Sequence, residues 1–131
     1  NARVSIVGFS MGGLVSRYYL QEMGGAKRCD RLITISTPHK GSNLAWCMYG
    51  KGAWQMRPGS SFLKQLERSE SKLGSMPVSS LRTPLDLVVI PSKHSNWARA
   101  ENRSYWVSLH PMMLTNHRVL GDVEAELLKK R

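Results

Sequence analysis

The stretch VSIVGFSMGGLVSRYYLQ, residues 4–21, changes its hydrophobic period in the middle. Val4–Val7 is an apolar run typical of a buried strand, whereas residues 11–23 repeat apolar side chains at the spacing of a helix. The segment Gly8-Phe9-Ser10-Met11-Gly12 joins the two without a polar linker. The sequence therefore predicts a strand that turns directly into a helix at a serine.

This joint fits the pattern G-x-S-x-G, in which a serine occupies a strained turn between a strand and a helix. We expect Gly8 and Gly12 to flank the turn because the close helix leaves no room for a Cβ at either position. The turn would expose the Ser10 hydroxyl, and the Met11 N–H at the helix N-terminus could stabilise a developing oxyanion. The alternative is an ordinary glycine-rich turn with a solvated serine, but a strand before it and a helix after it favour a nucleophile.

The rest of the chain extends this unit into an α/β fold with a mostly parallel sheet. Residues 44–76 are rich in Gly, Ser, Trp and Met, and they predict an insertion with one helix entered at Ser60-Ser61. The other expected strands are 30–37, 78–83 and 104–109. The helix 11–23 would have Val15, Tyr19 and Met23 on one face. A final helix is expected over 115–130, with Val119, Val123 and Leu127 on its inner face.

A serine nucleophile needs a histidine base, and the base needs a carboxylate that fixes its tautomer. In such a fold the acid and then the histidine follow the serine, each just past a strand. His110 ends the strand 104–109 and is the best candidate for the base. His39 precedes every plausible acid, while His94 lies in a polar loop and His117 near the start of the last helix.

Asp86 is the best candidate for the acid, because it lies just beyond the strand 78–83. Glu101 is the alternative, and its place in the loop before the last strand also fits a surface carboxylate. The remaining late acids fall on helix-like stretches and are typical of solvated faces.

Composition limits the other functions. The 131 residues suit one domain, 1–131, and the 19 basic against 9 acidic residues give a net charge of +10. These charges are scattered, including the basic C-terminus 129–131, so nucleic-acid binding is not indicated, although a basic surface favours anionic lipid or cell-wall surfaces.

Cys29 and Cys47 do not have the spacing of metal ligands or of a disulfide framework, and we expect them to be packing residues. No apolar run approaches the roughly 20 residues of a membrane span and no signal peptide is evident, so the sequence assigns no compartment.

Five segments in order resemble the lipase and esterase branch of the α/β-hydrolase superfamily, in particular bacterial triacylglycerol-lipase-like proteins. They are VSIVGFSMGGLVSRYYLQ, LITISTPHKGS, PGSSFLKQL, PVSSLRTPLDLVVIP and LHPMMLTNHRVL. The resemblance implies a triad of Ser10, Asp86 and His110, Met11 as an oxyanion donor through its N–H, and a cap over the acyl pocket at about residues 44–76. It implies no metal or cofactor. One difference is Phe9, where the family most often has histidine.

The resemblance also predicts that the fold is partial, with a sheet that starts at the strand bearing the nucleophile. Members of the family have earlier strands and a loop that supplies a second oxyanion donor, and the loss of one such donor costs about 2.7–4 kcal/mol of transition-state stabilisation. We therefore expect the chain to self-associate or to bind an upstream fragment that completes the sheet.

The expected function is hydrolysis of carboxylic esters, such as acylglycerols or short-to-medium acyl esters, through an acyl-enzyme. An acyltransferase or thioesterase would use the same triad. A further alternative is a catalytically silent half-fold that acts as a lipid-binding or assembly module.

Overall fold

The computed structural model describes residues 2–129, so Asn1, Lys130 and Arg131 lie outside the described residues. Within this range four strands form a single sheet, and all three pairings are parallel. Their order in the sheet is the order of the sequence: β1 (Val4–Phe9), β2 (Cys29–Ile35), β3 (Val78–Arg82) and β4 (Glu101–Ser104).

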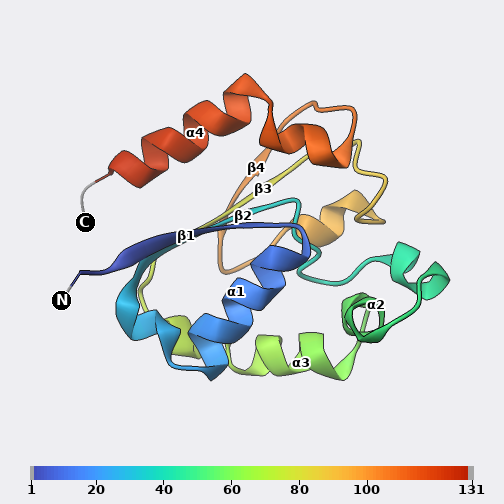
Figure 1. Ribbon diagram of the computed structural model, residues 1–131, viewed down its shortest axis with the longest axis horizontal. Coiled ribbons are helices and arrows are strands. Elements are labelled where there is room, and N and C mark those ends of the chain that lie inside the picture. Colours follow the sequence, from blue (N-terminus) through green and yellow to red (C-terminus); the bar gives the residue numbers. More distant parts are fainter. Residues whose placement is uncertain (1, 130–131) are drawn as a thin grey trace.

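Helices cover both faces of this sheet. Helices α1 (Met11–Glu22) and α3 (Ser61–Arg68) lie on one face and α4 (His117–Leu128) on the other, while the short α2 (Lys51–Met56) lies beyond the carboxyl ends of the strands (Figure 1). Short 3₁₀ turns complete the connections at η1 (Gly25–Arg28), η2 (Asn43–Cys47), η3 (Glu70–Leu73), η4 (Ser92–Ser95) and η5 (His110–Leu114). No described helix is both long enough and apolar enough to cross a bilayer.

Strand β2 carries the core because it is buried on both faces. Leu32 packs with Leu20 of α1 on one side. Ile33 and Ile35 pack with Val119 of α4 on the other. The strand predicted over residues 30–37 is therefore confirmed, at Cys29–Ile35, and its carboxyl end lies beside the turn that follows β1.

The predicted strand at 104–109 is wrong, because β4 lies earlier, at Glu101–Ser104. Its backbone pairs with residues 79–82 of β3 at the edge of the sheet, and its side chains are polar and mostly exposed. Tyr105 and Val107 are buried in the core but lie beyond the strand. Glu101, expected in a loop, therefore begins β4.

The helix faces also differ in part from the expectation. Val15, Tyr19 and Met23 share a face that is exposed, because α1 instead packs through Leu14 and Leu20, beside the buried Arg17 and Gln21. In α4, Val119 is buried and Val123 partly so, but Leu127 is exposed.

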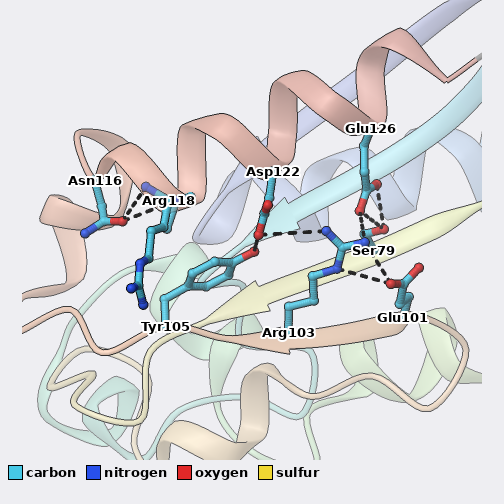
Figure 2. A network of polar contacts seen from close by, with 9 residues as sticks. Ser79, Glu101, Arg103, Tyr105, Asn116, Arg118, Asp122 and Glu126 are labelled. Atoms are coloured by element: carbon cyan, nitrogen blue, oxygen red, sulfur yellow. Dashed lines mark hydrogen bonds and ion pairs between the residues drawn. The ribbon is translucent and has the colours of Figure 1, made fainter.

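Polar contacts fasten α4 to the sheet. The buried carboxylate of Glu126 accepts the Ser79 hydroxyl of β3 at 2.7–2.8 Å and pairs with Arg103 of β4 at 3.3 Å. One turn earlier, Asp122 accepts the hydroxyl of Tyr105 at 2.6 Å (Figure 2). Two acids of one helix face thus meet donors from two strands and from the loop after β4, which sets the position of α4 over the sheet.

Candidate active site

The turn at Ser10 has the strain expected of it. Ser10 has φ 52° and ψ −125°, a region that side chains other than glycine rarely adopt. Its backbone N–H donates to the Ile35 carbonyl at 2.8 Å, which holds the turn against the end of β2. Ser10 is half-buried. Strain of this kind is concentrated at functional sites.

One of the two flanking glycines is required by packing, and the other is not. A Cβ on Gly8 would lie 2.7 Å from the Cα of Gly13, whereas a Cβ on Gly12 would meet nothing within 4 Å. The expectation that Gly12 has no room is therefore wrong. The crowded partner is Gly13, where a Cβ would lie 2.0 Å from the Thr37 hydroxyl. Strand and helix are therefore in close contact between Gly8 and Gly13.

Met11 begins α1, so its N–H has no carbonyl of the preceding helical turn to bond. It lies directly after Ser10 at the positive end of the helix dipole. This is where a developing oxyanion beside the Ser10 oxygen could be stabilised.

Asp86 and His110 are in direct contact. The Nδ1 atom of His110 lies 2.8 Å from Oδ2 of Asp86, and both side chains are buried. The second oxygen of Asp86 accepts the N–H groups of Val88 and Val89, each at 2.8 Å. Because a carboxylate only accepts, Nδ1 of His110 carries the proton and Nε2 is left as the basic nitrogen of the neutral ring.

Competing influences act on the pKa of Asp86. Burial is the largest and raises the pKa, but the hydrogen bonds from His110, Val89 and Val88 together leave it below its ordinary value. Asp86 is therefore ionised near neutral pH and can orient an imidazole or stabilise an imidazolium.

Thr83 holds the two loops of this pair together. Its hydroxyl, just past β3, donates to the Val107 carbonyl at 2.6 Å and accepts the N–H of Leu85 at 3.2 Å. One hydroxyl thereby joins the loop of the acid to the segment that leads to His110.

Phe9 connects this pair to the serine. Its ring, one residue before Ser10, lies 4.9 Å from the His110 ring, centroid to centroid, at 41°. No hydrogen bond joins Ser10 to His110 among the described contacts, and such bonds often tighten only when substrate binds. The structure thus brings Asp86 and His110 together directly and His110 to the residue beside Ser10. Sequence reasoning treated Phe9 only as a departure from the family pattern and missed this contact.

The other candidates lie elsewhere. His39 is buried, with Nδ1 3.2 Å from Nη1 of Arg17 and Nε2 3.0 Å from the Thr34 hydroxyl, and it stacks on Trp97 at 4.6 Å. Arg17 also lies over Trp97 at 4.2 Å, and burial lowers its pKa to about 10. No local pattern in the sequence indicates this cluster, because its members are distant in the chain.

The remaining histidines and acids have ordinary surroundings. His94 is 2.9 Å from the Gly41 carbonyl, His117 is exposed, and Glu101 pairs with Arg103 at 2.8 Å. Cys29 is a buried core residue as expected, but Cys47 is exposed and so is not a packing residue. Within residues 2–129 no group of three or more His, Cys, Asp or Glu side chains could hold a metal ion.

A family model described as palmitoyl protein thioesterase matches residues 1–72, more than half of the 131 residues of the chain. No curated protein matches the chain.

Solved structures, two of which are titled as lipases, share its fold. Bacillus licheniformis lipase BlEst2 in mature form superposes with a TM-score of 0.76 at 17% identity over 98% of this chain and 66% of that chain. The lin2722 gene product of Listeria innocua gives 0.73 at 14% identity, over 99% and 59%. Aspergillus fumigatus lipase B gives 0.62 at 21% identity, over 79% and 29%.

These similarities confirm the predicted α/β-hydrolase fold of lipase and esterase type, and its partial extent. The chain spans between 29% and 66% of the length of these three structures.

Proposed function

The chain belongs to the palmitoyl protein thioesterase family, and from this premise we propose that it is a serine hydrolase of acyl esters or thioesters, with Ser10, His110 and Asp86 as its triad. The observation that carries the proposal is the buried Asp86–His110 hydrogen bond of 2.8 Å, in a chain whose candidate nucleophile occupies a strained turn. The contact between Phe9 and His110 supports a common site.

In the proposed reaction the Ser10 hydroxyl attacks the acyl carbonyl while Nε2 of His110 takes its proton. The carbonyl π electrons move to oxygen, and the Met11 N–H stabilises the oxyanion. Collapse of this intermediate breaks the bond to the alkoxide or thiolate, which receives the proton from His110. Water then attacks the acyl-enzyme with His110 again as the base, which releases the acid and restores Ser10. Asp86 stays ionised and holds the imidazole throughout.

The family supports a thioester as the second candidate substrate, since the matching model is that of a thioesterase. The same triad serves both leaving groups. A groove of about 380 Å³ is lined by Trp46, Trp54, Phe62 and Arg57 among others, and none of the three proposed catalytic residues lines it. Ester hydrolysis releases an alcohol and thioester hydrolysis releases a thiol, whereas a silent binding module releases neither.

The test combines labelling by a fluorophosphonate with hydrolysis of p-nitrophenyl esters and matched acyl thioesters over a range of acyl lengths. We expect Ser10→Ala to lose both labelling and turnover, and Asp86→Asn to lower kcat about 10⁴-fold. Ser108→Ala, at an exposed serine two residues before His110, is the matched control and should keep both. A folded wild-type chain that is neither labelled nor active would instead favour the silent module.

A further inference from the structure

Large side chains are exposed together on the cap. Trp46 and Trp54 are 59% and 63% exposed, Tyr49 is 99% exposed, and Met48 is also exposed. We call the surface formed by these four residues and Arg57 the cap face. Proteins seldom leave several such side chains in water together, and contiguous apolar patches mark interaction sites.

Arg57 lies between the two tryptophans. Its Cζ atom is 4.7 Å from the centroid of the Trp46 ring and 4.3 Å from that of Trp54. Its Nε donates to the Ala45 carbonyl at 3.4 Å. No described carboxylate pairs with Arg57, and its two terminal nitrogens have no described hydrogen bond. The aromatic rings therefore hold a guanidinium whose fork remains available to an oxyanion such as phosphate.

The segment that carries the cap face contains cations and no carboxylate. Residues 44–66 include Lys51, Arg57 and Lys64 but no Asp or Glu. Lys51 is exposed at the start of α2. A stretch of this length without a carboxylate attracts anionic partners.

The cap face also lies near the nucleophile. A Cβ on Gly52 of α2 would be 3.3 Å from the sulfur of Met11, the residue after Ser10. Figure 1 shows α2 beyond the end of the sheet at which β1 turns into α1. A partner that binds the cap face would thus lie at the same end of the sheet as Ser10.

We propose that the cap face docks on a lipid bilayer that contains anionic phospholipids. Tryptophan suits the boundary between headgroups and acyl chains, because its ring is apolar and its N–H can stay hydrated. Arg57 and Lys51 pair with lipid phosphates at the same depth. An acidic peptide would neutralise the cations but leave the Trp and Met side chains in water. Docking would present acyl substrates to Ser10, and this consequence rests on the proposed function. The docking itself does not depend on that function.

The experiment measures flotation of the full chain with vesicles, in the Ser10→Ala background so that turnover cannot alter the lipid. Vesicles of phosphatidylcholine alone are compared with vesicles that also contain phosphatidylglycerol. We expect binding to the anionic vesicles only, weakening as salt is added. Because the Ser10→Ala protein cannot use Ser10 as a nucleophile, failure to bind vesicles counts against docking alone. The proposed hydrolysis is tested separately by the labelling and turnover assays.

Two variants and two controls locate the surface. Arg57→Gln should weaken binding about fivefold, the equivalent of about 1 kcal/mol for one cation. Trp54→Ala should weaken it about tenfold through lost apolar burial. The controls Arg28→Gln and Met23→Ala change exposed residues near the opposite end of the sheet and should bind as before. Circular dichroism checks that each variant is folded.

Three outcomes would overturn docking on anionic lipid. The first is equal binding to neutral and anionic vesicles, and the second is equal weakening by Arg28→Gln and Arg57→Gln, which would show a response to net charge alone. The third is displacement of the protein from the vesicles by an acidic peptide whose own binding requires Trp54. This outcome would identify a protein partner.

Discussion

Ser10 has a φ of 52°, a conformation that costs about 1–3 kcal/mol for a residue with a Cβ and must be held by its surroundings. The hydrogen bond to Ile35 holds it from the side of β2. The contact between Gly8 and Gly13 holds it from the side of α1. The close approach of these two glycines therefore maintains the turn that carries the serine.

We expect Gly8→Ala to lower the free energy of unfolding by about 3 kcal/mol or more, because the new Cβ would meet backbone atoms at 2.7 Å that cannot move aside. Gly12→Ala is the matched control and should leave stability unchanged or raise it by up to about 1 kcal/mol, since its Cβ meets nothing. Urea unfolding measures both. Equal effects at the two positions would contradict the packing described.

His39 is a second residue held in a specific state. Arg17 only donates, so Nδ1 of His39 accepts and Nε2–H donates to Thr34, whose hydroxyl donates to the Ser79 carbonyl at 3.3 Å. Burial, and then the charge of Arg17, hold the pKa of His39 well below its usual value. The ring is therefore neutral in the folded protein.

This state predicts a loss of stability in mild acid. A lowered pKa in the fold means that the unfolded chain binds the proton more readily, so the free energy of unfolding should fall as pH drops below about 6.5. The lowered pKa of Asp86 acts in the same direction but only below about pH 4. In His39→Gln, less stable at neutral pH, the slope between about pH 6.5 and 4.5 should flatten. His117→Gln, at an exposed ring, should keep it, and an unchanged slope in His39→Gln would refute this origin.

Among the elements, α4 depends on polar contacts more than the pattern of its sequence indicates. Val119 anchors its first turn in the core, but Leu127 near its end is exposed. The last turn is held instead by Glu126, through Ser79 and Arg103. Since α4 follows η5, which begins at His110, the position of α4 bears on that of His110.

Ser79→Ala should lower the free energy of unfolding by about 1.5–3 kcal/mol, the range for hydrogen bonds to charged groups, because Glu126 would lose its buried donor. Ser104→Ala, at an exposed serine of β4, should change little. In thermal melts the double variant Ser79→Ala/Glu126→Gln should cost less than the sum of the single changes. Additive effects would mean that the two side chains do not act as a pair.

The elements that could be predicted from the sequence are those with strong local signals. These are the strands β1 to β3, the turn at Ser10, and α3, where the Ser60 side chain accepts the Leu63 N–H as an N-cap. The prediction that β1 is buried is wrong, because Val4 and Val7 are exposed. Strand β4 could not be predicted, since it is short, polar and recognisable only by its pairing with β3. The exposed face of α1 was missed because periodicity gives the spacing of apolar residues but not which face packs.

The same limit applies to the site. Chain order selected Asp86 and His110, and the structure joins them by a hydrogen bond. His110 does not follow a strand end as predicted, because β4 ends at Ser104 and His110 begins η5. The contact of Phe9 with His110 and the cluster around His39 depend on tertiary packing, which no local pattern contains. The roles of Ser10, Asp86 and His110 in catalysis stay predictions for the labelling assay.

For the whole molecule, the free edge of the sheet at β1 is the main feature. Among the described strands, β1 pairs only with β2, and Val4 and Val7 on it are exposed. An unpaired apolar edge offers hydrogen-bonding groups to another strand. The expected self-association therefore has a specific surface.

Light scattering of the 131-residue chain should give a mass above that of one chain. Val7→Lys should shift the mass toward the monomer, because a charge on an edge strand opposes pairing. Leu87→Lys, at an exposed leucine in the loop after β3, is the control and should leave the mass unchanged. A wild-type chain that is monomeric throughout would contradict pairing at β1.

Each of β2, β3 and β4 pairs with the strand before it in the chain, so a nascent polypeptide can add strands in turn as it leaves the ribosome. The bend at Ser10 can close once β2 has emerged, since Ile35 supplies its carbonyl. His110 emerges only a hundred residues after Ser10. Any reaction of Ser10 that depends on this imidazole therefore cannot occur during most of translation. The growing chain would thus not be acylated at Ser10 before the rest of the fold has been synthesised.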